Sequence, residues 1–443
     1  MTSTLERRTT ATGMVNRLHT IAGLFVAPLL LVAALSGLVY ALAPSMEQVV
    51  YRDELGATSG LPARPVAEQI AAGRAVRPDL AFSAVEVSED SDATTRVLLT
   101  DPSLPGGSYR QAVFVDPGSL EIRGELVQYG SSRALPLRAW ISEGHRSLWL
   151  GEPGRIYSET AASWLGILSM AGVWLWWSRR HRGGRGGSLR RRLSGAHSLL
   201  GVWLAPGFLF LTVTGLTWSL VAGGNIGELR AQLNWVEPTP VVTVAGHSTG
   251  AAHHGGHTSA PVATDTSAVD TVITAARAQG LTGMLDVNAP ADQHNAWVAR
   301  ESRDAWKFAN DSVSVDAETG AIVDSVDFAD WPLAAKLSAW LIQLHSGQLL
   351  GLLNQVILAV IALGLIAMVC LGYAMWWKRG FGRLPPAGQW RRVRPPVLVG
   401  IGVFLLAYAL VAPLFGISLL AFLVLDAALQ RVRMRQRLRH GRR

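Results

Sequence analysis

Four histidines stand beside long apolar runs, and their surroundings form two matched pairs. His19 opens the segment His19-Thr-Ile-Ala-Gly23, and His197 opens the similar segment His197-Ser-Leu-Leu-Gly201. His145 and His345 each follow a Trp by five residues and precede a Trp-Trp pair by thirty-one. A neutral imidazole is a good axial ligand for haem iron, and two imidazoles fill both axial positions. The pairs therefore predict two bound haems, an inner one on His19 and His197 and an outer one on His145 and His345.

The elements that must position these histidines are membrane-spanning helices. The mean hydropathy is +0.25 and only 16% of the residues are charged, while apolar runs of about twenty residues are long enough to cross a bilayer. We expect four core spans near 18–42, 157–177, 199–221 and 352–377. The stretch 397–425 is also apolar but is interrupted at 412–416, so it indicates either two short spans or a tight hairpin.

The charge distribution predicts how the chain is oriented. Arginine and lysine gather in 178–192, in 378–394 and in the tail from Arg431, and segments of this kind stay on the cytoplasmic side. Both termini are then cytoplasmic, and the chain is a multi-pass membrane protein. The positive charge reflects this topology and not nucleic-acid binding. The first apolar run is an anchor and not a signal peptide, because it is too long and no cleavage site follows it. With one cysteine, Cys370, a disulfide or iron–sulfur site within the chain is excluded.

The chain is a tandem duplication in which each half holds a span, an outer segment, a histidine and a second span. The outer segments each predict a helix, over 63–76 and 268–279, followed by antiparallel strands. The stretch from Val113 to Ile122 matches the stretch from Val313 to Ile322, and both indicate a β-hairpin around an aspartate. Each outer segment is therefore expected to be a separate small α+β domain.

The hairpin, the order of the four histidines and the Trp-Trp ends together resemble the PepSY-associated transmembrane family from about Asn16 to Asp426. The resemblance implies two extracytoplasmic PepSY-like domains on a helical bundle. It also implies two b-type haems and activity as a ferric-siderophore reductase in iron uptake. Such a protein passes electrons across the membrane to an extracytoplasmic ferric chelate and needs no catalytic residue beyond its haems.

Small and basic residues near the histidines are candidates for haem contact. Gly23 and Gly201 follow their histidines by one helical turn and are candidate haem-packing positions, and Gly37 and Gly215 lie five turns along. The segment Glu152-Pro153-Gly154 predicts a helix break after His145, for which the second repeat has no proline. Candidate partners for haem propionates are Arg17, Arg138, Arg146 and Lys336.

Several alternatives remain open from the residues alone. The insert with His247, His253, His254 and His257 is a solvated linker or a weak metal-binding segment. The haems could reduce copper or a protein partner in place of a siderophore, or the PepSY-like domains could regulate a peptidase without haem. No flavin or nicotinamide motif is evident, so a membrane quinol or a cytoplasmic reductase must donate the electrons. The lipid bilayer is the remaining partner.

The expected division of the chain can be given by residue ranges. The parts are a cytoplasmic N-terminus (1–17), TM1 (18–43), the first outer domain (44–136), an interfacial segment with TM2 (137–177), a basic loop (178–196), TM3 (197–222), the second outer domain (223–332, with the insert 247–257), an interfacial segment with TM4 (333–377), a second basic loop (378–396), a hydrophobic hairpin (397–427) and a basic tail (428–443).

Overall fold

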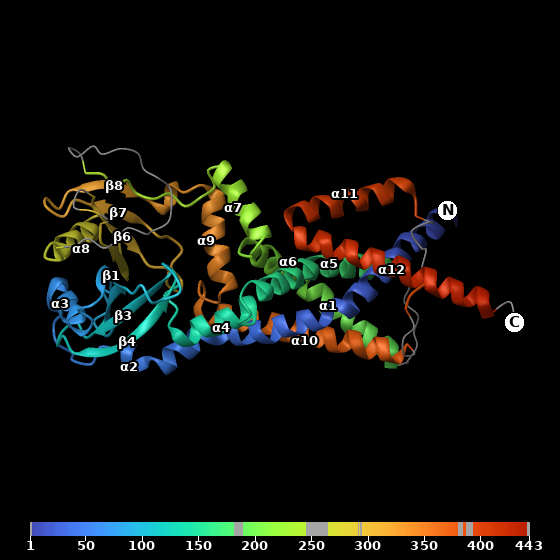
Figure 1. Cartoon of the computed structure of the whole chain (residues 1–443), viewed down its shortest axis with the longest axis horizontal. Coiled ribbons are helices and arrows are strands. Elements are labelled where there is room, and N and C mark those ends of the chain that lie inside the picture. The colour runs from blue at the N-terminus through green and yellow to red at the C-terminus, as the bar shows by residue number, and fades with distance from the viewer. Residues whose placement is uncertain are drawn as a thin grey trace. The chain divides into compact units, whose positions relative to one another are not determined.

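The computed structural model describes residues 2–180, 189–244, 265–290, 292, 295–379, 384–386 and 393–440. The chain divides into two compact units (Figure 1). A helical unit comprises 1–41, 143–233 and 356–443, and a sheet unit comprises 42–142 and 234–355. Each unit therefore draws residues from both halves of the duplication.

The sheet unit contains one antiparallel sheet of eight strands in the order β4-β3-β2-β1-β5-β6-β7-β8. The strands of the two outer segments join in this one sheet, since the first strands of the two repeats, β1 and β5, pair with each other. This pairing removes an exposed edge from each four-stranded half. The strands are β1 (Ala81–Val87), β2 (Thr95–Thr100), β3 (Tyr109–Val115), β4 (Ile122–Tyr129), β5 (Leu285–Asn288), β6 (Trp297–Glu301), β7 (Ser312–Val315) and β8 (Ile322–Val326).

The two hairpins predicted from the sequence are confirmed, because β3 pairs with β4 and β7 pairs with β8. The predicted helices are also present as α3 (Val66–Val76) and α8 (Val269–Ala278). Both helices cover the same face of the sheet (Figure 1). Alternate strand residues such as Val85 and Val287 pack beneath them in one apolar core.

The opposite face of the sheet carries a smaller core and most of its buried charge. Ala84, Leu98 and Phe114 pack there with the short helix α2 (Arg52–Leu55) through Leu55. Glu86 and Arg96 point to the same side, because they alternate with the residues of the large core.

The join between the two repeats places like charges opposite each other. Glu86 of β1 lies directly across from Asp286 of β5, and the two positions are equivalent in the duplication, 200 residues apart. Burial and the neighbouring Glu86 raise the pKa of Asp286 to about 6. Like charges in direct cross-strand register destabilise a sheet. Loss of the Asp286 proton therefore lowers the stability of the sheet where the two repeats meet.

The helical unit contains the long apolar helices. Three of the described helices are long and apolar enough to span a membrane, over Ala11–Val50, Leu189–Thr217 and Gly351–Lys378. They belong to α1 (Thr2–Val50), α6 (Leu189–Thr217) and α10 (Gly351–Lys378). The remaining helices of this unit are α5 (Glu152–Arg179), α7 (Ala222–Gln232), α11 (Pro395–Val411) and α12 (Pro413–His440).

The second expected span forms a helix, α5, which is not one of those three candidates. One polar residue of α5 is buried and paired within the helical unit. Glu159 is only 2% exposed and accepts hydrogen bonds from the backbone of Val221 and Ala222, at 2.8 and 3.1 Å. These amides begin α7, so the carboxylate satisfies free donors at the positive end of that helix. Glu159 is thus a structural cap inside the helical unit.

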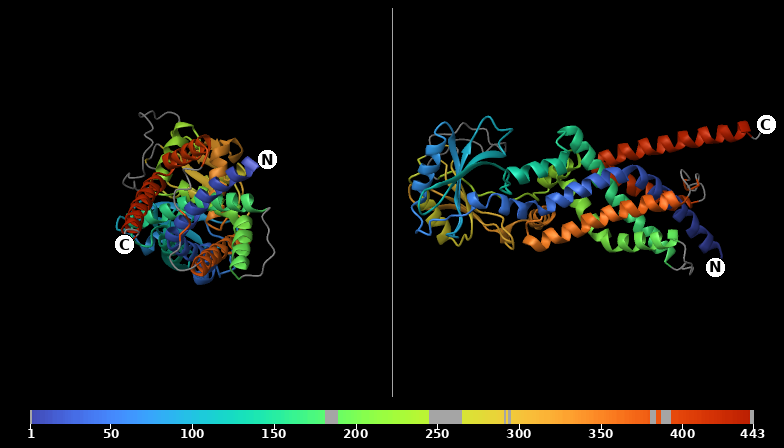
Figure 2. Two further views of the ribbon diagram at one scale, coloured as in Figure 1. Left: turned by 90° about the vertical axis from the view of Figure 1, so that its right-hand side faces the viewer. Right: turned by 90° about the horizontal axis from the view of Figure 1, so that it is seen from below.

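Close packing between these helices depends on small residues. A Cβ at Gly166 would come within 2.8 Å of Thr212, and one at Gly364 within 2.2 Å of Leu204. Any larger side chain would therefore push α5 from α6, or α10 from α6. The last two helices turn back on each other at Ala412, and α12 is the red helix that ends at the C-terminus in Figure 2.

Both histidines of the second pair end a helix before a sharp break. α4 (Pro136–Ser147) and α9 (Leu333–His345) contain His145 and His345 in their last turns. The first break lies at Leu148 and Trp149, both with positive φ, and Pro153 lies inside the first turn of α5. The expected break at Glu152-Pro153-Gly154 is therefore placed too late. The second repeat breaks between Gly347 and Gly351, which also have positive φ, so it needs no proline.

Candidate functional site

The first histidine pair comes together inside the helical unit. His19 lies on α1 and His197 on α6, and their ring centroids are 6.3 Å apart with planes inclined at 78°. The Nδ1 atoms of both rings are buried and have no hydrogen-bond partner among the described residues. Buried ring nitrogens are normally paired, so this pair has an unmet demand for a ligand.

The two rings are backed in the same way by two different helices. His19 lies against the Leu168 backbone of α5, and the Cβ position of Gly172 is 3.4 Å from its Cε1. His197 lies against the Met368 backbone of α10, and the Cβ position of Gly372 is 3.9 Å from its Cε1. The supporting residues are 200 positions apart, so the duplication has built one site from two equivalent halves.

This geometry fits a metal held between two imidazoles. A metal–imidazole bond is about 2 Å long and the ring centroid lies roughly 1 Å behind the nitrogen, so two axial rings place their centroids about 6 Å apart. The observed 6.3 Å agrees with this separation. Among the described residues, no three His, Cys, Asp or Glu side chains gather to hold a metal ion alone. Two histidines could serve as the protein ligands of a haem, whose macrocycle brings its own nitrogens.

The two glycines predicted to pack against the haem have different surroundings. A Cβ at Gly23 would meet no described atom within 4 Å, so room remains beside it. At Gly201 a Cβ would come within 3.0 Å of the Met368 side chain. The positions that touch the histidine rings are Gly172 and Gly372. Their offset of 200 was readable in the sequence, but only the packed helices show which face they occupy.

His145, on α4, lies against three residues of α1. Ser36 Oγ lies 3.0 Å from its Nδ1, and the Tyr40 ring stacks on it at 5.6 Å with planes 14° apart. The Cβ position of Gly37 is 3.1 Å from His145 Cε1, so only glycine allows this approach. Gly37 therefore serves the second histidine pair and not the first. A hydrogen bond at Nδ1 fixes the ring and would leave Nε2 to bind a metal.

His345 belongs to the sheet unit, where it ends α9. Asn354 Nδ2 donates to the carbonyl of the preceding residue, Leu344, at 2.8 Å. This bond satisfies one terminal carbonyl of α9 and ties it to α10. Because His145 and His345 lie in different units, their pairing stays a prediction.

The predicted propionate partners all have protein contacts. Arg17 pairs with Asp426 and Arg146 with Glu143. Lys336 Nζ donates to the carbonyl of Ala329 at 2.6 Å. The fourth, Arg138, lines a cavity described below. The insert histidines His247, His253, His254 and His257 lie outside the described residues, so their predicted metal binding also stays a prediction.

The sequence profile of the PepSY-associated TM region matches residues 16–379. The chain belongs to this family. It is a membrane protein, and the matched region contains all four histidines and both repeats. No curated protein matches the chain.

Proposed function

We propose that the protein is a transmembrane di-haem electron carrier that reduces an extracytoplasmic ferric siderophore. His19 and His197 hold the inner haem, and His145 and His345 hold the outer one. A bound haem supplies a one-electron ferric–ferrous couple. The observation that carries the proposal is the buried His19–His197 pair, whose 6.3 Å separation suits two axial ligands.

The chain's own residues support this role by holding the rings and excluding water. Leu168 and Met368 back the two inner imidazoles. A haem held by His19 and His197 would have two protein ligands and would supply electron relay in preference to oxygen chemistry. Reduction of ferric iron weakens its bonds to hard oxygen ligands, so a chelate releases the metal after one electron arrives.

The orientation completes the proposal. The basic segments place the first histidine pair toward the cytoplasm of a bacterial inner membrane, where a quinol or a reductase donates electrons. The sheet unit then lies outside, on the acceptor side. Copper or a protein remains the alternative acceptor. The alternative without haem, a PepSY-type peptidase regulator, gives no role to the unpaired Nδ1 atoms of His19 and His197.

An absorption spectrum separates these functions. The purified protein should show the sharp α-band of a low-spin b-type haem after reduction with dithionite, and a ferric siderophore should then reoxidise it. Absence of the α-band would favour the alternative function, a PepSY-type peptidase regulator without haem. Reoxidation by cupric ion but by no ferric chelate would show that copper is the electron acceptor of the haem protein.

A further inference from the structure

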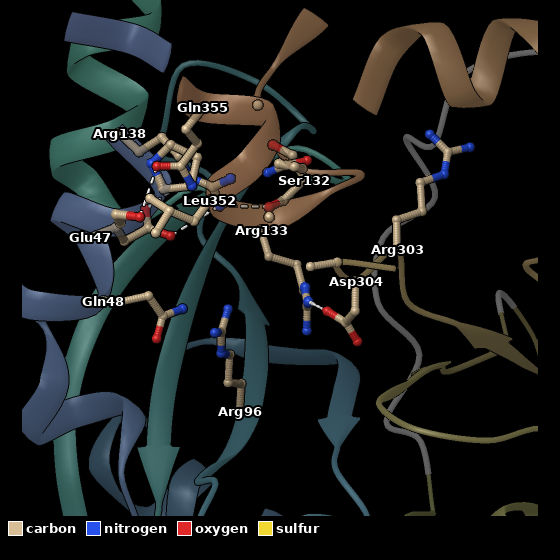
Figure 3. A pocket seen from close by; sticks show the side chains of 16 residues that line it. Glu47, Gln48, Arg96, Ser132, Arg133, Arg138, Arg303, Asp304, Leu352 and Gln355 are labelled. Atoms are coloured by element: carbon tan, nitrogen blue, oxygen red, sulfur yellow. Dashed lines mark hydrogen bonds and ion pairs between the residues drawn. The ribbon is translucent and has the colours of Figure 1, made fainter. Parts of the chain in front are cut away.

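The sheet unit contains a polar cavity of about 290 Å³ that the proposed electron route does not yet use (Figure 3). Residues of both repeats line it, from the end of α1, the start of α4, the loop after β6 and the start of α10. Its volume is near the lower end of the range for small-molecule sites. It therefore has room for a compact ligand or for one polar arm of a larger one.

Arginine side chains dominate the charged part of the cavity lining. Arg96, Arg133, Arg138 and Arg303 line it together with two carboxylates, Glu47 and Asp304. Glu86 and Glu237 pair with Arg96 and Arg303 from outside the lining. A guanidinium carries five N–H donors and cannot lose its proton at neutral pH. One carboxylate partner for each arginine uses only some of these donors. The cavity is consequently suited to an anion with several oxygen atoms.

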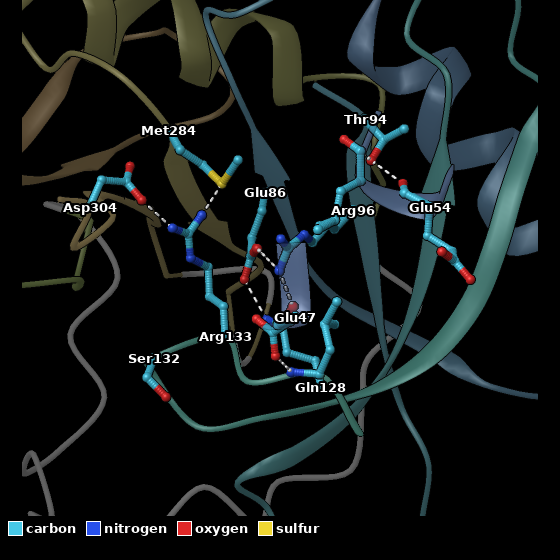
Figure 4. Close-up of polar contacts among 12 residues, drawn as sticks. Glu47, Glu54, Glu86, Thr94, Arg96, Gln128, Ser132, Arg133, Met284 and Asp304 are labelled. Carbon is cyan, nitrogen blue, oxygen red and sulfur yellow. Dashed lines mark hydrogen bonds and ion pairs between the residues drawn. The ribbon is translucent and has the colours of Figure 1, made fainter. Parts of the chain in front are cut away.

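Arg96 is held in place by residues that do not line the cavity. Arg96 is 8% exposed, donates to Gln128 Oε1 at 2.8 Å and lies 3.6 Å from Glu86 Oε2 (Figure 4). Gln128 in turn donates to Glu86 at 2.6 Å. Burial lowers the pKa of Arg96 to about 10, so it stays charged at neutral pH. A fixed, partly desolvated cation attracts an anion more strongly than a mobile surface lysine does.

The segment that carries Arg133 and Arg138 is fixed from α1. Glu47 is 5% exposed and accepts hydrogen bonds from the Leu135 amide at 2.7 Å and from Arg138 Nε at 3.1 Å. Arg133 has a φ of 56°, a left-handed conformation that is unfavourable for a residue with a Cβ. From there its guanidinium pairs with Asp304 of the other repeat. Such local strain at a lined cavity is typical of a binding site.

The cavity also adjoins a proposed electron-transfer residue. The turn after His345 contributes Gly347 and Gln348 to the lining, and the following helix contributes Leu352 and Gln355. A ligand in the cavity therefore touches the turn that follows a candidate axial ligand. Three of the four arginines come from the first repeat and one, Arg303, comes from the second, so the cavity combines both halves of the duplication.

We propose that this cavity binds the carboxylate groups of an anionic ferric chelate, and that it selects anionic over cationic acceptors. This inference rests on the proposed function for the role of the chelate as electron acceptor, but the binding itself does not need electron transfer. Carboxylates of haem propionates have the same chemistry, so the experiment must tell the two sources apart.

The test uses gallium(III) citrate, a redox-inert analogue of an anionic ferric chelate, with the full-length protein in detergent. Titration calorimetry should show saturable binding that weakens with salt. Arg303→Gln should weaken it at least tenfold, and Arg303→Lys less. Arg300→Gln is the matched control, because Arg300 pairs with the same Glu237 at 2.9 Å but does not line the cavity. Arg133→Gln provides a second variant if the first fails to fold.

The remaining outcomes are distinct. Equal affinity in the wild type and both cavity variants, or equal weakening in Arg300→Gln, would overturn the proposal. Loss of haem from Arg303→Gln without a change in gallium citrate affinity would assign the cavity to propionates and also overturn it. Binding of gallium citrate by a protein without haem would instead contradict the proposed function alone. In the reductase assay, Arg303→Gln should slow reoxidation by ferric citrate and leave a cationic ferric trihydroxamate unaffected.

Discussion

The inner histidine pair and His145 are positioned by different means, although all three residues lie in the helical unit. His19 and His197 face each other across a symmetric site, and each has a buried Nδ1 without a described partner. His145 already has a hydrogen-bond partner, Ser36, and a stacked ring, Tyr40. The inner site is thus arranged by helix packing, and the equivalent helices of the two repeats each hold one of its histidine rings. The outer ligand is oriented by side chains specific to its own repeat, so the two proposed haems should respond differently to mutation.

The largest effect is expected from removing an axial ligand. His19→Ala should eliminate the inner haem and leave the outer one, because only the inner site uses that ring. The haem content per protein, measured by pyridine haemochrome, should fall by about half. His197→Ala should give the same loss, and the double variant should lose no more. Unequal losses in the two single variants, or an additive loss in the double variant, would contradict the assignment of His19 and His197 to one haem.

A bulky residue at Gly37 should selectively damage the site of His145. A Cβ there would lie 3.1 Å from the His145 ring, so Gly37→Leu must displace it. The matched control is Gly23→Leu, where a Cβ meets no described atom within 4 Å. Reduced-minus-oxidised spectra should lose the outer component only in Gly37→Leu. An equal effect of both variants would show that general helix packing explains the loss.

Removing the Ser36 hydroxyl should have a smaller effect on the same histidine. Ser36→Ala deletes the hydrogen bond to His145 Nδ1, a type of change that typically weakens ligation by about 10–100-fold. Redox titration should show a shifted midpoint potential for one haem and an unchanged potential for the other. Ser36→Thr, which keeps the hydroxyl, should restore the original value. A shift of both potentials would contradict the assignment of Ser36 to one site.

The smallest effect concerns the sheet unit and depends on pH. The pKa of Asp286 is raised to about 6, so the folded state keeps a proton that the unfolded state releases between pH ~4 and ~6. Stability therefore falls as the pH rises through this window. Above pH 6, Asp286→Asn should raise the thermal midpoint and increase the free energy of unfolding by at most about 3 kcal/mol. Below pH 4 the substitution should have little effect. A gain that is independent of pH would contradict this account of the join.

The sequence allowed much of the repeat architecture to be predicted, because histidine spacing and apolar runs are local patterns. The hairpins after Val115 and Val315 and the helices α3 and α8 follow from such patterns. The pairing of Glu86 with Asp286 joins segments 200 residues apart and has no local signal. The same is true of Gly172 beside His19 and of the four-arginine cavity, which depend on how distant helices and loops pack.

The measurement that tests the central claim most directly is the electron paramagnetic resonance spectrum of the oxidised His145→Ala variant, which isolates the inner haem. Two imidazole planes near perpendicular, as the 78° between His19 and His197 indicates, give a highly anisotropic low-spin ferric signal. We predict that signal in His145→Ala and its loss when His19→Ala is added. A high-spin signal from a single axial ligand, or a low-spin signal that survives the removal of His19, would contradict a haem held by His19 and His197.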